Sequence, residues 1–138
     1  MRGFRVPIVQ METILALLGK HIEKVIEEYA HGEMTLISVK RLLHAGTFQL
    51  WLAMDEGQIK GWGITEVVQY PELRRIRFVF LGGIDFDEWS RELTPTIEEW
   101  AKSFGATEIE AWTRPGFYKK LSKQGFKKAY DVLLRTIE

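Results

Sequence analysis

Residues 74–105 read RRIRFVFLGGIDFDEWSRELTPTIEEWAKSFG, and the prediction of the fold starts from this stretch. Residues 74–81 are almost continuously apolar after Ile76, which predicts a strand in the centre of a sheet. Gly82 and Gly83 follow and indicate a turn. If the protein is an enzyme, we expect chemistry or cofactor binding where this strand meets the following helix.

Two helix starts follow the glycine pair. Asp85, with Glu88 three residues later, has capping-box spacing and predicts a short helix that runs to Leu93. Thr94 before Pro95 then predicts the N-cap and the first residue of a second helix. The apolar residues that share one face of this second helix are Ile97, Trp100, Ala101 and Phe104. The glycine at the end of the stretch terminates the helix.

The chain before this stretch predicts one edge strand, two helices and a hairpin. Residues 4–10 predict an edge strand or arm, because their proline cannot donate to a ladder. Apolar residues at helical spacing predict a helix over residues 11–30, with a break at Gly19 left open. Thr35 is the expected N-cap of a second helix, which Gly46 ends.

A β-hairpin is predicted next, from residues 48–54 and 59–70 joined by the turn DEGQ. Gly61 and Gly63 in its second arm indicate a bulge or a close approach of the backbone to a neighbour.

Three elements are predicted after the central stretch. They are a strand over residues 107–113, a basic helix over 115–123 and a closing strand over 126–137. The whole chain then has the order α-α-β-β-β-α-β-α-β. This order predicts one α/β domain over residues 1–138, with a mixed sheet flanked by helices.

Composition narrows the class of protein. The 138 residues are 46% hydrophobic and 28% charged, as in ordinary globular domains. The formal net charge is zero, which disfavours a global field for nucleic acid. The absence of cysteine excludes disulfides and thiol nucleophiles. The start of the chain has no signal-peptide cleavage site, and its apolar patch at residues 14–18 is too short to span a bilayer.

The order of elements resembles the GNAT superfamily of acyl-CoA-dependent N-acyltransferases. The most specific local match is EIEAWTRPGFYKKLSKQGFKKAYDVLLRTIE at residues 108–138, in which Gly125 and Phe126 resemble the turn into the last strand of that family. A narrower set of motifs resembles small GNAT-like proteins of tailed bacteriophages. These motifs are VFLGG at 79–83, DEW at 87–89, IEEWAKSFGA at 97–106, RPGF at 114–117, GF at 125–126 and Y.VL at 130–133. That narrower resemblance implies an internal or structural virion protein, located in the host cytoplasm or in the virion.

The GNAT resemblance implies a cofactor site at the end of the central strand, where backbone groups pair with pantetheine. The residues at this place are Phe80, Leu81, Gly82 and Gly83. A core strand that ends in a turn explains the same residues without a cofactor.

The resemblance also implies a pyrophosphate-binding loop after that strand, with Gln or Arg, two residues, Gly, one residue, and Gly or Ala. The sequence here is GGIDFDEWSREL, which lacks this pattern. Asp85, Asp87 and Glu88 crowd the helix start instead, and each contact with a phosphate would cost on the order of a few kcal/mol. We therefore expect no cofactor, and acetyl-CoA only if the protein is an enzyme.

Catalytic residues are not evident either. The positions where many members carry a functional Asn and Tyr fall on Arg114 and Leu121, and Tyr118 lies one turn earlier. Glu66 and Glu110 lie on predicted strands and are candidate general bases if their pKa values are raised. A solvent-facing position on a half-exposed strand explains each glutamate more simply.

Other residue classes suggest surfaces. The three histidines have no metal-ligand spacing, so we expect no metal. Every charged residue from Arg114 to Lys128 is basic, which fits a solvated helix face, a cofactor phosphate or an acidic partner better than nucleic acid. The tryptophans that we expect on a contact surface are Trp51, Trp62, Trp89 and Trp112.

Two functions follow as hypotheses. The first is a non-catalytic virion component that binds protein partners and can form a homo-oligomer. The alternative is an acyl-CoA-dependent N-acetyltransferase with a divergent pyrophosphate loop. No membrane role is expected for either.

Overall fold

A five-stranded sheet forms the centre of the protein, seen in a computed structural model that describes residues 1–113 and 115–138. Its strands, in spatial order, are β1 (Arg2–Arg5), β2 (Phe48–Asp55), β3 (Gln58–Gln69), β4 (Arg74–Gly83) and β5 (Glu108–Ala111). Neighbouring strands are antiparallel except β4 and β5, which are parallel. The helices are η1 (Ile8–Gln10), α1 (Met11–Tyr29), α2 (Leu36–His44), α3 (Phe86–Ser103), η2 (Pro115–Phe117) and α4 (Tyr118–Ser122). The predicted α/β fold with a mixed sheet is confirmed.

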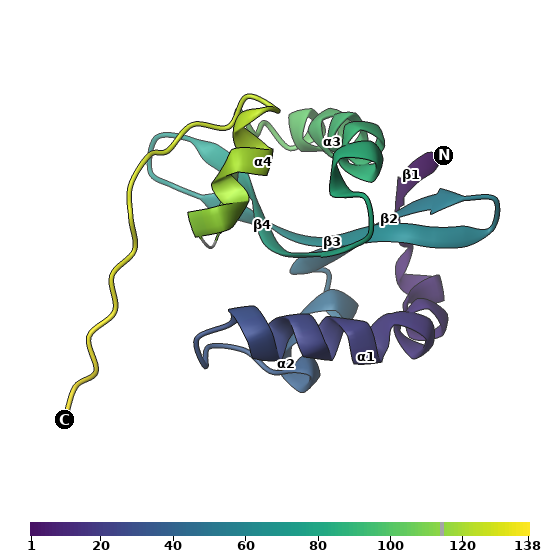
Figure 1. The fold of residues 1–138 in the computed structure, drawn as a ribbon, viewed down its shortest axis with the longest axis horizontal. Coiled ribbons are helices and arrows are strands. Elements are labelled where there is room, and N and C mark those ends of the chain that lie inside the picture. The colour runs from purple at the N-terminus through teal and green to yellow at the C-terminus, as the bar shows by residue number, and fades with distance from the viewer. Residues whose placement is uncertain (114) are drawn as a thin grey trace.

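Helices cover both faces of the sheet. Figure 1 shows α1 and α2 below the sheet, and α3 and α4 above it. Each face has its own apolar cluster, because alternate strand residues point to opposite sides. Leu50 and Ile64 belong to the α1–α2 cluster, whereas Trp51 and Ile76 belong to the α3 cluster. Among the described residues, no helix is long and apolar enough to cross a membrane.

The region of residues 85–105 forms one helix, so the predicted division into two helices is wrong. Pro95 lies inside α3, and a buried stripe continues across it. The residues of this stripe, four apart, are Trp89, Leu93, Ile97 and Ala101. Packing of this stripe on the sheet outweighs the cost of an internal proline, which is about 3 kcal/mol in an isolated helix. Asp85 occupies the predicted N-cap position, but it has φ 51° and its side chain makes no capping bond.

The hairpin is confirmed, with Glu56 and Gly57 at positive φ in its turn. The bulge and the close approach of the backbone to a neighbour, which the glycines of β3 indicated, both occur. The register shifts between Ala53 and Met54, which leaves Lys60 as an extra residue beside Gly61. A Cβ atom on Gly61 would lie 2.2 Å from the Trp89 ring, so the backbone must approach that ring without a side chain.

The N-terminal elements differ from the prediction in their bounds. β1 is an edge strand as expected, but it ends before the proline at position 7. α1 is continuous through Gly19. Thr35 caps α2, where it forms a capping box with Ser38.

The predicted closing strand is absent. Residues 126–138 form neither helix nor strand, and the chain runs past the edge of the sheet to a C-terminus away from the fold (Figure 1). A strand needs a hydrogen-bonded partner, whatever its apolar pattern. Within the described residues, β5 is an outer strand of the sheet and has no partner on that side. The basic helix at 115–123 is present as η2 followed by the five residues of α4.

Candidate functional site

The end of β4 extends beyond its parallel neighbour. β5 pairs with β4 only from Arg75 to Phe78, while β4 continues to Gly83. The register between β3 and β4 shifts after Phe78, so Val79 is an extra, bulged residue at this point. Beyond the bulge, the β4 edge that faces away from β3 has no strand partner among the described residues. Its backbone groups are therefore available to a ligand.

The four predicted cofactor residues, Phe80, Leu81, Gly82 and Gly83, lie on this free edge. Phe80 is buried in the α1–α2 cluster. A Cβ atom on Gly82 would lie 2.5 Å from the Trp62 ring, which explains the first glycine by packing. Gly83 has φ 132°, and its backbone lies against the backbone of Lys60. Packing alone thus accounts for the glycine pair.

Aromatic side chains fill the space between α3 and α4 beside this edge. The rings of Phe86 and Phe117 lie 4.8 Å apart, and Phe86 also meets Trp89 edge-on at 5.1 Å. Nearby, Gln124 Nε2 donates to Ser90 Oγ over 2.7 Å. The cavity left between these helices has a volume of only about 10 Å³. A water molecule barely fits in a volume of this size.

The charge at the start of α3 disfavours an anion. Asp87 and Glu88 place two carboxylates in the first turn, and Asp85 occupies the N-cap position. A helix N-terminus ordinarily attracts phosphate through its amides and its dipole, and these carboxylates oppose that attraction.

The two glutamates that the sequence indicated as candidate bases lie in one ion-pair cluster. Arg77 Nη1 donates to Glu66 at 2.9 Å, and Arg77 Nε donates to Glu110 at 2.7 Å. The Tyr70 hydroxyl donates to the other oxygen of Glu110 at 2.6 Å, and Arg75 approaches that oxygen at 3.4 Å. We call these five residues the Arg77 cluster. The sequence did not predict that one arginine joins both carboxylates.

The pKa of Glu110 is shifted downward. Burial of its carboxyl favours the neutral form, but hydrogen bonds from Tyr70 and Arg77 and the charge of Arg77 outweigh burial, so the pKa of Glu110 is lower than usual. A general base for acyl transfer benefits from a raised carboxyl pKa. Hydrogen bonding to Glu110 conversely raises the pKa of Tyr70. This arrangement suits a structural ion pair better than proton transfer.

The described family positions in the C-terminal part lie on α4. Leu121 is 3% exposed and packs in the interior. Tyr118 begins α4, and the ammonium of Lys128 lies 4.9 Å from its ring. Arg114 lies outside the described residues, so its place in the predicted basic patch is not assigned. The lysines that complete this patch make no ion pair among the described residues, consistent with a solvated face.

The tryptophans are mostly interior, which corrects the predicted contact surface. Trp51, Trp62 and Trp89 are buried, because their rings fill both apolar clusters. Trp112 is 54% exposed and stacks on the Arg77 guanidinium at 4.1 Å. The described residues contain no group of side chains suited to hold a metal ion.

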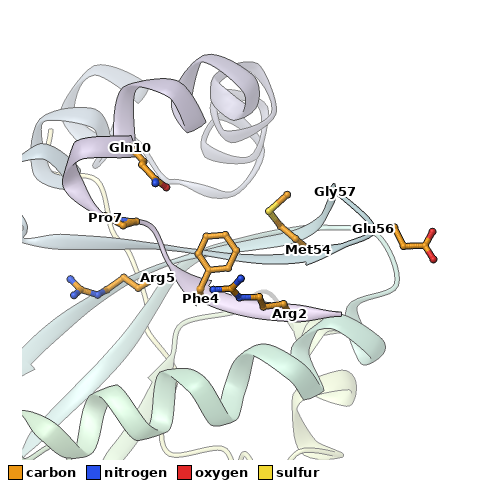
Figure 2. Close-up of a pocket in the computed structure, with 8 residues that line it drawn as sticks. All are labelled: Arg2, Phe4, Arg5, Pro7, Gln10, Met54, Glu56 and Gly57. Atoms are coloured by element: carbon orange, nitrogen blue, oxygen red, sulfur yellow. The ribbon is translucent and has the colours of Figure 1, made fainter.

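A second hollow, which the sequence did not reveal, lies beside β1. It has a volume of about 590 Å³ and is lined by β1, η1 and the β2–β3 turn. Figure 2 shows the Arg2 guanidinium next to the Phe4 ring, while Arg5 points away from it. The i, i+2 spacing of Arg2 and Phe4 is the signal that places them on one face of a strand.

We compared the sequence and the fold with those of known proteins. No protein-family model and no curated protein matches the chain. Solved structures do match over nearly the whole chain. A probable acetyltransferase superposes with a TM-score of 0.72 at 13% identity, covering 100% of this chain and 97% of its own. An aminoglycoside acetyltransferase from an uncultured soil metagenomic sample, in complex with sisomicin, has a TM-score of 0.71 at 15% identity, with 99% and 96% covered.

A predicted acetyltransferase from Clostridium acetobutylicum, solved with acetyl-CoA, has a TM-score of 0.64 at 11% identity and covers 98% of this chain and 95% of its own. Identities this low establish the fold and leave the activity open. The protein has the fold of the GNAT acyl-CoA N-acyltransferases.

Proposed function

We propose that this protein uses the GNAT fold to bind a protein partner and does not transfer acyl groups. The observation that carries the proposal is the filled space between α3 and α4, where Phe86 and Phe117 are in contact beside the free edge of β4. An acyl-CoA that paired with this edge as in the family would need that space for its pantetheine arm.

Electrostatics support the same conclusion. The diphosphate of the cofactor would meet Asp85, Asp87 and Glu88 at the start of α3. At an effective dielectric constant near 20, each close contact of like charge opposes binding by on the order of a few kcal/mol. The Arg77 cluster in turn neutralises the glutamates that would have to accept a proton.

The partner is proposed to be a virion protein. This part rests on the resemblance of motifs within residues 79–133 to phage GNAT-like proteins, and the structural comparisons do not bear on it. Detection of the protein at a constant copy number in purified particles would support the assignment. Absence of the protein from such particles would contradict the assignment of a virion partner.

The cofactor experiment separates the two functions. Isothermal titration and thermal unfolding of the full chain with acetyl-CoA should show no heat of binding and no rise in midpoint up to millimolar concentration. A ligand that binds the native state selectively must raise that midpoint. Stabilisation at micromolar acetyl-CoA would overturn the proposal.

Two variants show whether the aromatic contact is the obstacle. Phe86→Ala opens the space beside α4, while Phe104→Ala truncates a 42%-exposed aromatic residue just past the end of α3 and serves as the matched control. Binding of acetyl-CoA by the first variant alone would show that the phenylalanine excludes the cofactor.

An acyl-CoA-dependent N-acetyltransferase is the second candidate. The bulge at Val79 and the unpaired edge of β4 favour it, because they leave backbone donors and acceptors for an extended ligand. The solved neighbours are acetyltransferases, one of them with acetyl-CoA. This function requires Phe86 and Phe117 to separate before the cofactor enters, which the titration above would detect as binding.

A further inference from the structure

The outer side of β1 is an open edge of the sheet. β1 is the end strand on its side, and no described strand pairs with it there. The amide of Val6 donates to the carbonyl of Leu50, and with the observed register this means that the even-numbered residues of β1 bond to β2. Gly3 and Arg5 therefore direct their amides and carbonyls outward. None of these four groups bonds to another described residue.

A hollow lies along the same strand. It is the hollow of about 590 Å³ described above, and Phe4 and Met54 both line it. The Phe4 ring points from β1 toward Met54 on the hairpin (Figure 2). Arg2 shares this face of the strand, and its guanidinium lies 5.5 Å from the centre of the Phe4 ring. The hollow therefore offers an apolar surface next to a cation.

Two arginines give the edge a positive charge. Arg2 and Arg5 are exposed and make no ion pair among the described residues. Arg5 lies on the opposite face of β1, with its guanidinium 5.6 Å from the Trp100 ring. Glu56 is the acidic residue in the lining of the hollow, and Asp55 beside it pairs with the N-terminal ammonium at 3.3 Å. The edge thus keeps a net positive charge, which an acidic strand would neutralise.

A second copy of β1 is a poor occupant of this edge. It would bring four arginines into one short ladder, and like charges on neighbouring strands oppose pairing. Charged residues and proline on an edge strand also hinder unspecific pairing. Pro7, at the next outward position, has no amide, so the ladder is limited to Gly3 and Arg5. These features disfavour a neutral or basic strand and leave an acidic one acceptable.

We infer that the outer edge of β1 binds an extended acidic segment of a partner protein, which adds one strand to the sheet. This inference rests on the proposed function in partner binding and names the surface that serves it. The segment carries carboxylates opposite Arg2 and Arg5. Opposite Phe4 it carries a large apolar side chain, which enters the hollow because directly opposite residues share a face of the sheet.

The hexapeptide acetyl-Thr-Glu-Leu-Leu-Glu-Thr-amide tests the inference. Its sequence reads the same in both directions, so it presents the same side chains to β1 in a parallel or an antiparallel addition. Isothermal titration into the full chain should give a Kd on the order of 10 to 500 µM. The matched control acetyl-Thr-Lys-Leu-Leu-Lys-Thr-amide should bind roughly tenfold more weakly or less. Equal binding of the two peptides, or no binding of the acidic one at millimolar concentration, would overturn the inference.

Charge reversal identifies the edge. The double variant Arg2→Glu, Arg5→Glu should bind the acidic peptide roughly tenfold more weakly, and it should bind the lysine peptide more tightly than the unchanged chain does. This gain of binding also shows that the variant is folded. Arg41→Glu reverses an exposed arginine on α2 and should leave both affinities unchanged. A double variant that keeps its affinity for the acidic peptide would place binding elsewhere and overturn the inference.

Hydrogen exchange of the unchanged chain shows whether the peptide pairs as a strand. With the acidic peptide at about ten times its Kd, the amides of Gly3 and Arg5 should exchange about tenfold more slowly, because only the unbound fraction exchanges. The amide of Phe4 already bonds to β2, so the peptide should protect it less. Binding without protection of Gly3 and Arg5 would overturn the inference.

Failure of this inference is distinguishable from failure of the proposed function. Absence of peptide binding would leave the proposed function intact, because a partner can use another surface. The proposed function fails instead by binding of acetyl-CoA, which none of the peptide experiments involves.

Discussion

Arg77 connects two carboxylates that lie 44 residues apart in the sequence, Glu66 on β3 and Glu110 on β5. The Glu110 side chain is 8% exposed, and Arg77 shares the stabilisation of its charge with Tyr70 and Arg75. Removing one partner of a shielded ion pair leaves the remaining charge less well compensated, which costs more than the intact pair contributes.

We expect Arg77→Met to lower the free energy of unfolding by about 2–3 kcal/mol. Methionine preserves much of the side-chain volume but removes both ion pairs. Lys102→Met removes an exposed pair with Glu99 and should change the same quantity by less than about 0.5 kcal/mol. Urea unfolding of the two variants measures both values. Equal effects would mean that the Arg77 cluster contributes little to stability.

Glu110 should make the free energy of unfolding decrease at acidic pH. Its pKa is lower in the folded state than in the unfolded chain, so its contribution is present above the unfolded pKa, near 4.3. That contribution is lost as the pH falls through the folded pKa. Glu110→Gln should therefore destabilise the protein at pH 7 and much less at pH 3, as measured by urea unfolding at both pH values. A difference that stays constant with pH would contradict the lowered pKa.

At the scale of elements, the contact between β3 and α3 depends on a missing side chain. Gly61 lies directly under the Trp89 ring, whereas a Cβ atom on Gly19 in α1 would meet nothing within 4 Å. The same substitution should therefore have opposite effects at the two positions.

We expect Gly61→Ala to lower the free energy of unfolding by about 1–3 kcal/mol, because the methyl group forces α3 away from the sheet. Gly19→Ala should raise it by roughly 0.5–1 kcal/mol, since alanine has the higher helix propensity. Thermal unfolding of both variants checks the pair of signs. A neutral Gly61→Ala would show that α3 is not held tightly against β3.

In α3, a local helix-start signal predicted the wrong boundary. Thr94 and Pro95 have the sequence of a helix start, yet they lie inside one helix. Trp89, Leu93 and Ile97 keep a four-residue spacing across the proline, and this longer pattern was the better guide. The stripe is buried against the sheet, and this tertiary packing outweighs the local N-cap signal of Thr94 and Pro95.

The whole molecule has two apolar clusters but should unfold as one unit, because β2 and β3 contribute residues to both clusters. Ile22→Ala in the α1–α2 cluster and Ile97→Ala in the α3 cluster remove fully buried side chains. Each should lower the free energy of unfolding by about 2–4 kcal/mol. Far-UV circular dichroism and tryptophan fluorescence should report the same midpoint for each variant. Midpoints that differ between probes would show that the two layers unfold separately.

Sequence alone determined the elements whose signals are local. The alternation around the turn DEGQ, the cap at Thr35 and the apolar run of β4 specify the hairpin, the start of α2 and the central strand, because each depends on neighbours a few residues away. The order of these elements was enough to predict the GNAT fold.

Only the tertiary structure decided the site. The contact of Phe86 with Phe117 and the joining of Glu66 to Glu110 bring together residues about 30 to 45 positions apart, and sheet order and register set those distances. The last segment is the clearest case: residues 126–137 have the pattern of a strand, but a strand forms only where a partner edge accepts its hydrogen bonds. Whether that edge exists depends on the assembled sheet and not on the pattern of the segment.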